Sequence, residues 1–252
     1  MDAKRISDQL RLAFKDSGLT IWEVARRAEL PVAEVAKVLG HAKWPPVDLV
    51  EAVGHALGLE LAFVEAQTRH LVSAPRTVID EAVACVAPEA LVHPVGGGVK
   101  VLALDLEATL ISDPASARAR PGLYEFLEAI HGLFESVVLF TTLPELKFRE
   151  LALALMQEQS VPPWFVAATF VRWSGLTKDL NFIPFITAEE ALLVDDMAQV
   201  VHPGQEQQWV RVRSYVPPFD EHDDELQRVL EELVDRVVGR APVGVHQHAP
   251  HD

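Results

Sequence analysis

Apolar runs and amphipathic stretches alternate along the second half of the chain, and they predict a parallel α/β sheet. Short apolar runs, typical of buried strands, occur at 99–104, 136–140, 191–194 and 209–212, and a strand-like stretch lies at 164–173. Helical spacing of apolar residues occurs at 123–130, 144–157 and from 220 onward. Strands that alternate with helices in this order favour a parallel sheet with helices on both faces.

The first 65 residues have a different pattern, which predicts a small all-α domain. Helical spacing recurs there in short stretches separated by glycines and prolines. Thr20 followed by Glu23 is the signature of a capping box, and it marks the start of the second helix. The predicted organisation is a helical domain at 1–65, a linker with one helix at 66–98, an α/β domain at 99–240 and a disordered tail at 241–252.

Polar residues follow three of the predicted strands. The pairs are Asp105 and Glu107, Thr141 and Thr142, and Asp195 and Asp196; Lys178 lies on the loop before the third strand. Because the carboxyl ends of parallel strands form one edge of a sheet, where ligands bind, we expect these side chains to converge. Carboxylates there can hold a metal or act as nucleophile and acid/base. Taken one at a time, each aspartate also has a simpler explanation, since turns favour polar residues.

The order of these segments resembles a known family. LDLEATLI, VVLFTT, KDL and LLVDDM follow the four-motif order of the haloacid dehalogenase superfamily. Within it they are most similar to the NLI-interacting-factor-like phosphatases, the family that includes the small C-terminal-domain phosphatases. The resemblance covers residues 99–238. It implies a Rossmann-like parallel sheet of the haloacid dehalogenase type and a Mg²⁺-dependent phosphomonoester hydrolase that works through an aspartyl-phosphate.

The resemblance also implies roles for single residues. Asp105 would be the nucleophile and Glu107 the acid/base. Thr141, Thr142 and Lys178 would bind the phosphoryl oxygens. Mg²⁺ would be held by the carboxylates of Asp105 and Asp196 and the backbone carbonyl of Glu107, with Asp195 as a supporting carboxylate.

The chain departs from the family at Glu107, where the family has Asp. The additional methylene moves the carboxylate by about 1 Å, and a misplacement of that size can cost about 100-fold in rate. The departure predicts slow turnover, a different substrate geometry or an inactive domain.

Spacing and charge bear on the substrate. Thr141 follows Asp105 by 36 positions, which a turn and one helix fill, so no separate cap domain fits there. An open site admits a phosphate displayed on a macromolecule, such as a phosphoprotein or a nucleic-acid end. Residues 66–252 contain fourteen Lys and Arg against twenty-seven Asp and Glu, which favours a protein or a small molecule.

The N-terminal helices carry a second resemblance. LTIWEVARRAELPVAEVAKVLG, followed by PPVDLVEAVGHALGLEL, is similar to the Cro/C1-type helix-turn-helix family over residues 5–65. In that family the helix that begins at Val32 would lie in the DNA major groove. The residues expected to contact DNA or a protein partner are Ile21, Trp22, Val32, Ala33 and Lys37.

The composition of this segment favours protein over DNA as the partner. Residues 1–65 contain eight Lys and Arg against ten Asp and Glu, and apolar side chains occupy the DNA-reading positions. We therefore expect a targeting or dimerisation module that packs on another subunit or on the second domain. The alternative is a DNA-binding regulator whose phosphatase-like domain is a sensor or is inactive.

Composition limits the remaining possibilities. The net charge of −15 disfavours a surface that tracks nucleic acid or anionic lipid. The single cysteine, Cys85, excludes an internal disulfide and suits a reducing compartment. No apolar run reaches the length of a membrane span, so we expect a cytoplasmic protein without a membrane partner.

Overall fold

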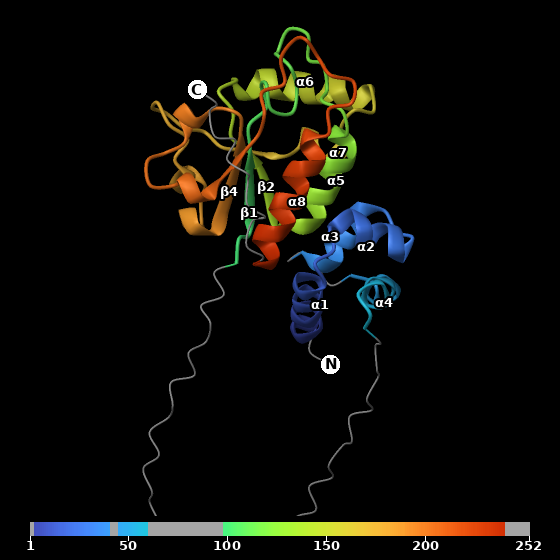
Figure 1. Ribbon diagram of the computed structural model, residues 1–252. Coiled ribbons are helices and arrows are strands. Elements are labelled where there is room, and N and C mark those ends of the chain that lie inside the picture. The colour runs from blue at the N-terminus through green and yellow to red at the C-terminus, as the bar shows by residue number, and fades with distance from the viewer. Residues whose placement is uncertain (1–2, 41–44, 60–97, 240–252) are drawn as a thin grey trace, which may run out of the picture.

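A computed structural model describes residues 3–40, 45–59 and 98–239, and it confirms the predicted fold class. Five parallel strands form one sheet in the order β3-β2-β1-β4-β5 (Figure 1). The strands are β1 (Val101–Leu104), β2 (Ser136–Leu139), β3 (Thr169–Phe170), β4 (Ala191–Asp195) and β5 (Trp209–Arg211). The predicted linker helix, Cys85 and the predicted disordered tail lie outside the described residues.

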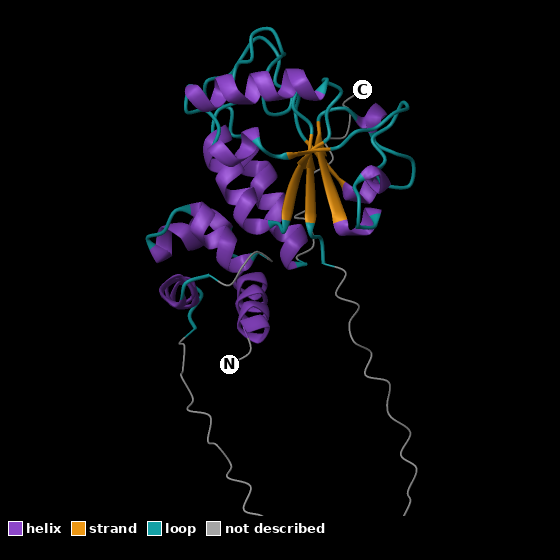
Figure 2. Ribbon diagram, turned by 180° about the vertical axis from the view of Figure 1, so that it is seen from behind, coloured by secondary structure: helices purple, strands orange, loops and turns teal. Residues whose placement is uncertain are grey.

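The two faces of the sheet are covered differently. Leu102 and Leu104 belong to a core shared with α5 (Leu123–Leu133), α6 (Glu145–Gln157) and α8 (Glu225–Val238). Val101 and Ala103, which alternate with them, pack on a segment of loops and the short 3₁₀ helices η1 (Leu180–Phe182) and η2 (Ala188–Glu190). Figure 2 shows the long helices on one side of the strands and loops on the other. The expectation of helices on both faces is therefore correct for one face only.

The stretch at 164–173 was expected to be strand-like, and this prediction is wrong for its first half. A short helix, α7 (Pro163–Val166), comes first, and β3 has two residues. Proline suits the first turn of a helix because its φ is already helical and its missing N–H has no partner to lose. Phe165 of α7 is buried against Phe148 of α6, with ring centroids 5.5 Å apart. The prolines and the packing of Phe165 therefore favour a helical turn here, although the β-branched residues of the stretch favour a strand.

The N-terminal segment consists of four helices in the residues described. They are α1 (Ala3–Ser17), α2 (Ile21–Ala28), α3 (Val32–Leu39) and α4 (Val47–Ala56). The capping box is confirmed: the Glu23 amide donates to Thr20 Oγ1 at 3.2 Å, and the Thr20 amide donates to Glu23 Oε2 at 2.8 Å. Glu29 ends α2 in the left-handed region, with φ 55°. None of the described helices is long and apolar enough to cross a membrane.

These helices do not form a separate body. Their apolar side chains and those of α5 and α8 belong to one continuous core, and α3 lies directly on α5. Glycines allow the close approach, because a Cβ on Gly40 would lie 2.5 Å from the carbonyl oxygen of Gly132. Gly132 lies near the end of α5 that leads into β2. The helices therefore sit at the amino edge of the sheet, opposite the strand carboxyl ends (Figures 1 and 2).

Candidate active site

A buried cluster of charged side chains lies at the carboxyl edge of the sheet. Asp105 follows β1 and Asp195 ends β4, and the parallel pairing of these strands places the two side by side. Lys178 Nζ lies between them, 2.6 Å from Asp105 Oδ1 and 2.6 Å from Asp195 Oδ2. All three side chains are buried. The fold thus brings together residues that are 17 and 73 positions apart.

Two hydroxyl groups complete this cluster on the side of Asp196. Thr109 Oγ1 lies 3.2 Å from Asp105 Oδ2 and 3.4 Å from Asp196 Oδ1, so one hydroxyl bridges two carboxylates. Ser214 Oγ donates to Asp196 Oδ2 at 2.5 Å. Neither Thr109 nor Ser214 was predicted as a site residue. Thr109 lies four positions after Asp105, and Ser214 follows β5 at the same sheet edge, which are signals that the sequence contains.

The cluster has more negative than positive charge. Carboxylate oxygens of Asp105, Asp195 and Asp196 lie within 4.8 Å of one another. Among the described residues, the positive charge paired with them is the Lys178 ammonium group, which contacts Asp105 and Asp195. Burial raises the pKa of Asp105 to about 6, with Lys178 opposing the shift and Asp195 adding to it. Burial also raises the pKa of Asp195. A bound divalent cation would neutralise this excess charge.

The donor set fits Mg²⁺. Both oxygens of Asp195 already have partners, since Oδ2 accepts from Lys178 and Oδ1 accepts from the Met197 amide at 2.8 Å. Asp105 Oδ2 and Asp196 Oδ1 instead contact one shared hydroxyl, and oxygen ligands of this kind are those that Mg²⁺ prefers. Asp105 and Asp196 are thus the candidate ligands, and the position of Asp195 suits a supporting role.

Glu107 lies at the mouth of the site. The turn after β1 is tight, with φ 54° at Ala108, and Glu107 is half-buried. Its carboxylate accepts a hydrogen bond from the exposed Thr142 hydroxyl at 2.8 Å. Thr141 is buried beneath, where its carbonyl accepts from the Trp173 indole N–H at 3.0 Å. Asp105 is therefore deep in the site, whereas Glu107 and Thr142 form its outer rim.

A surface cavity lies beside the outer rim of the site. A cavity of about 420 Å³ adjoins Thr141 and Thr142, and its other walls include Phe170, Arg172 and Trp173. Between Asp105 and Thr141 the chain forms turns, α5 and the sheet strand β2, so this interval contains no separate cap domain. A phosphate on a bulky carrier can approach such an edge.

The loop that carries Lys178 is tied to the segment after β4. The Lys178 amide donates to the Val200 carbonyl at 2.6 Å, and Thr177 Oγ1 lies 2.9 Å from His202 Nδ1. His202 Nε2 lies 3.8 Å from Asp179. These contacts flank the ammonium group without touching it, and so they fix the position of the loop.

Five residues were expected to contact DNA or a partner: Ile21, Trp22, Val32, Ala33 and Lys37. Ile21 and Val32 are buried in the core that includes α5 and α8, and the other three lie close to residues of these helices. Trp22 lines a cavity of about 330 Å³ together with Phe126 of α5 and Leu230 of α8. A Cβ on Gly132 would meet Lys37 Cγ at 2.4 Å, which places α3 against α5.

Comparisons with known proteins agree with this geometry. The family model of NLI interacting factor-like phosphatases matches residues 100–242, which is more than half of the chain. Searches of curated proteins and of solved structures give no significant match. The matched span contains all the charged residues of the site and both hydroxyl groups that contact Asp196. On the strength of that match, the chain belongs to the NLI interacting factor-like phosphatase family.

Proposed function

We propose that the protein is a Mg²⁺-dependent phosphomonoester hydrolase that works through an aspartyl-phosphate on Asp105. The observation that carries the proposal is the cluster at the carboxyl edge of the sheet, in which buried Lys178 lies between Asp105 and Asp195 and carboxylate oxygens of Asp105, Asp195 and Asp196 lie within 4.8 Å of one another. Membership of a phosphatase family supports the reaction class. Phosphoryl transfer requires mainly positioning and charge neutralisation, and this cluster offers both.

The first chemical step would form the aspartyl-phosphate. A carboxylate oxygen of Asp105 attacks phosphorus, the bond from phosphorus to the ester oxygen breaks, and Glu107 gives its proton to the departing oxygen. In the second step Glu107 takes a proton from water, which attacks phosphorus and releases Asp105 and inorganic phosphate. The place of Glu107 at the outer rim, beside Thr142, suits contact with a leaving group.

Two sets of protein groups would stabilise the negative charge that develops on the phosphoryl oxygens. Lys178 supplies a buried positive charge 2.6 Å from Asp105. Thr141 and Thr142 present hydroxyl and backbone groups at the end of β2. Mg²⁺, held by Asp105 and Asp196 with the Glu107 carbonyl, would add a second neutralising charge.

A direct assay tests this function. Hydrolysis of an aryl phosphate is expected with Mg²⁺ and not with a chelator, and Asp105→Asn should remove it. Glu107→Gln should lower kcat by about 100-fold to 10,000-fold, the usual contribution of a general acid/base. Glu107→Asp restores the family residue and is expected to keep or raise activity. Wild-type turnover no faster than that of Asp105→Asn would contradict the proposed function.

For the substrate we propose a phosphate on an exposed carrier, either a phosphoprotein or a small molecule. The open cavity beside Thr142 leaves room for a carrier, and the acidic net charge of this part of the chain disfavours nucleic acid. A panel of phosphopeptides and phosphorylated oligonucleotides distinguishes these substrates. Faster turnover of the oligonucleotides would contradict the choice.

For the N-terminal helices we propose a packing module within the chain instead of a DNA reader. The support is that α3, the helix that would enter the major groove, lies on α5 with five of its residues buried. Binding to duplex DNA would require that this contact opens. A gel-shift series at increasing salt is expected to show no binding above that of an unrelated acidic protein. Salt-dependent binding would favour the DNA-binding regulator.

A further inference from the structure

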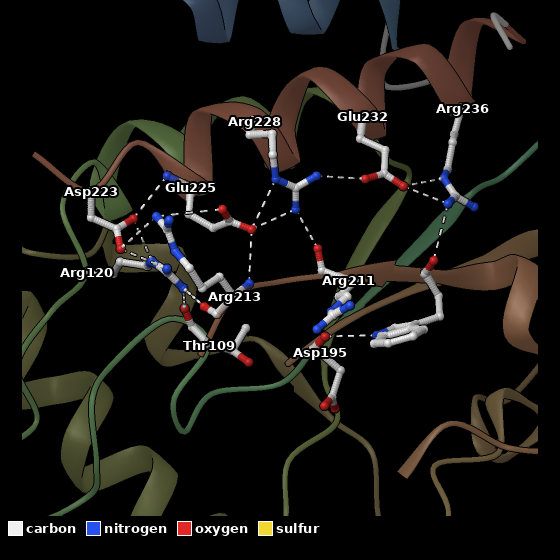
Figure 3. A network of polar contacts seen from close by, with 11 residues as sticks. Thr109, Arg120, Asp195, Arg211, Arg213, Asp223, Glu225, Arg228, Glu232 and Arg236 are labelled. Atoms are coloured by element: carbon white, nitrogen blue, oxygen red, sulfur yellow. Dashed lines mark hydrogen bonds and ion pairs between the residues drawn. The ribbon is translucent and has the colours of Figure 1, made fainter. Parts of the chain in front are cut away.

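A fully buried arginine lies next to the site without touching its reacting groups. The Arg120 guanidinium donates to both carboxylate oxygens of Asp223, from Nε at 3.0 Å and from Nη2 at 2.9 Å. Its remaining nitrogen, Nη1, donates to the backbone carbonyls of Thr109 at 3.1 Å and Arg213 at 2.8 Å. Figure 3 shows Arg120 between these partners. The side chain thus joins the turn after β1 to the segment after β5.

Each segment that Arg120 holds supplies a hydroxyl to Asp196. Thr109 Oγ1 lies 3.4 Å from Asp196 Oδ1. Ser214, the residue after Arg213, donates to Asp196 Oδ2 at 2.5 Å. The Arg120 guanidinium therefore fixes the distance between Thr109 and Ser214, whose hydroxyl groups contact the two carboxylate oxygens of Asp196.

The surroundings make Arg120 rigid. Its guanidinium carbon lies 5.1 Å from the centroid of the Tyr215 ring, and the Tyr215 amide donates to the Ala108 carbonyl at 2.6 Å. This second tie again joins the turn after β1 to the segment after β5. Asp223 is itself held, because its Oδ1 accepts from the Glu225 amide at 3.0 Å. Asp223 lies two residues before the first residue of α8 and is tied to it by this bond.

We propose that Arg120 is a positioning residue that sets the orientation of the Asp196 carboxylate, and through it the affinity for the divalent cation. The inference rests on the proposed metal-dependent function. Residues that orient a metal ligand from outside commonly change metal affinity by about 10-fold to 100-fold when they are altered. A longer or shorter side chain at this position would shift Thr109 and Ser214, and so the oxygens of Asp196, without removing a ligand.

The test measures Mg²⁺ binding to the full chain by calorimetry, without substrate. Arg120→Lys keeps the charge but loses the fork that reaches Asp223 and the two carbonyls. We expect its Kd for Mg²⁺ to rise about 10-fold. In the assay, the Mg²⁺ concentration for half-maximal activity should rise in parallel, with the KM for an aryl phosphate at saturating Mg²⁺ within twofold of wild type.

Arg149→Lys is the matched control. Arg149 also donates from Nη1 to two backbone carbonyls, those of Val166 at 2.7 Å and Ala168 at 2.8 Å, and from Nη2 to a carboxylate, Glu145. It lies on α6 and contacts neither hydroxyl-bearing segment. Its Mg²⁺ affinity should equal that of wild type. A similar loss in both variants would mean general destabilisation and would overturn the proposal.

Ser214→Ala shows whether Arg120 acts through Asp196. This exposed substitution leaves the core intact and should weaken Mg²⁺ binding in the same direction. In the double variant the two losses should combine to less than their product, because both act on one carboxylate. If the loss of Mg²⁺ affinity in the double variant equals the product of the two single losses, the two residues act independently. That result would contradict the proposal that Arg120 acts through Asp196.

A further variant covers the case in which Arg120→Lys does not fold. Asp223→Glu keeps the ion pair and displaces the guanidinium, and we expect the same rise in Kd. Wild-type Mg²⁺ affinity in a folded Arg120→Lys or Asp223→Glu protein overturns this inference alone. A wild-type protein that binds no divalent cation would overturn the proposed function and this inference with it.

Discussion

Two ionic clusters adjoin each other at Thr109, and they differ in how their acids are paired. At the candidate site, which we call the unbalanced cluster, Lys178 pairs with Asp105 and Asp195, and no cation among the described residues pairs with Asp196. Beside it, a network pairs each of its three acids with at least one arginine, and we call it the balanced cluster for that reason (Figure 3). Its members are Arg120, Arg213, Arg228 and Arg236 with Asp223, Glu225 and Glu232.

The pKa directions of the acids follow this balance. Burial acts to raise the pKa of Asp223, but the hydrogen bonds from Arg120 and the Glu225 amide, together with the nearby arginine charges, outweigh it and the pKa lies below its ordinary value. Burial likewise acts to raise the pKa of Glu225, but hydrogen bonds from Arg228 and the Arg213 amide, together with the arginine charges, lower it overall. At the site, burial dominates and the pKa values of Asp105 and Asp195 are raised. The acids paired with arginines thus have lowered pKa values, whereas Asp105 and Asp195 have raised ones, which is typical of a functional site.

The largest expected effect comes from removing an acid of the unbalanced cluster. Asp105→Asn should lower the hydrolysis rate by about 10,000-fold or more, because it removes the nucleophile. In the absence of metal, its free energy of unfolding should equal or exceed that of wild type, since one repelling charge is gone. Denaturant unfolding with a chelator measures this, with the exposed Asp220→Asn as control. A clearly lower free energy of unfolding for Asp105→Asn would contradict the distinction between the two clusters.

Removing an acid of the balanced cluster should have the opposite signature. Asp223→Asn leaves the Arg120 guanidinium buried without its counter-charge, which typically costs about 3–5 kcal/mol of unfolding free energy. Thermal and denaturant unfolding measure the loss. A variant as stable as wild type would show that Glu225, whose pKa the charge of Arg120 also lowers, supplies the counter-charge.

Added Mg²⁺ should stabilise the protein through the unbalanced cluster alone. At a Mg²⁺ concentration of 100 times Kd, binding to the folded state contributes about 2.7 kcal/mol. This increase in stability with Mg²⁺ should disappear in Asp196→Asn and persist in Arg228→Met. Thermal melts over a Mg²⁺ series measure it, and an equal gain in Asp196→Asn would place the cation elsewhere.

The smallest effect is expected at the exposed end of the balanced cluster. Arg228 has a half-exposed side chain paired with Glu225 and Glu232. Exposed ion pairs contribute about 0–1 kcal/mol, so Arg228→Met should change the unfolding free energy by no more than about 1 kcal/mol. Its hydrolysis rate should match wild type. A loss as large as that of Asp223→Asn would mean that the network acts as one unit.

The sequence predicted the strands, their parallel pairing and the convergence of the charged site residues. These succeed because a buried parallel strand needs a continuous apolar run and because its carboxyl end has a fixed position in the sheet. The prediction for 164–173 failed because Pro162 and Pro163 start a helical turn where composition favoured a strand. The capping box at Thr20 was readable because both of its bonds are local.

Contacts between distant residues were not predictable from the pattern. Arg120 and Asp223 are 103 positions apart, and nothing in either local stretch indicates a buried pair. The Ser214 contact with Asp196 depends on the path of the chain after β5, which periodicity does not determine. The position of α3 on α5 depends on the missing side chains of Gly40 and Gly132, and single glycines are too common to reveal such an approach.

The packing of α3 on α5 also means that the family domain and the folding unit have different boundaries. The family match begins at residue 100, yet Val35 and Leu39 lie in the same core as Leu133 and Val237. A fragment cut at residue 100 would expose this apolar surface to water, and we expect it to aggregate or to require the excised helices, added in trans, to stay dispersed. In the intact chain α3 covers this surface, so we expect the solubility of the family domain to depend on the N-terminal helices.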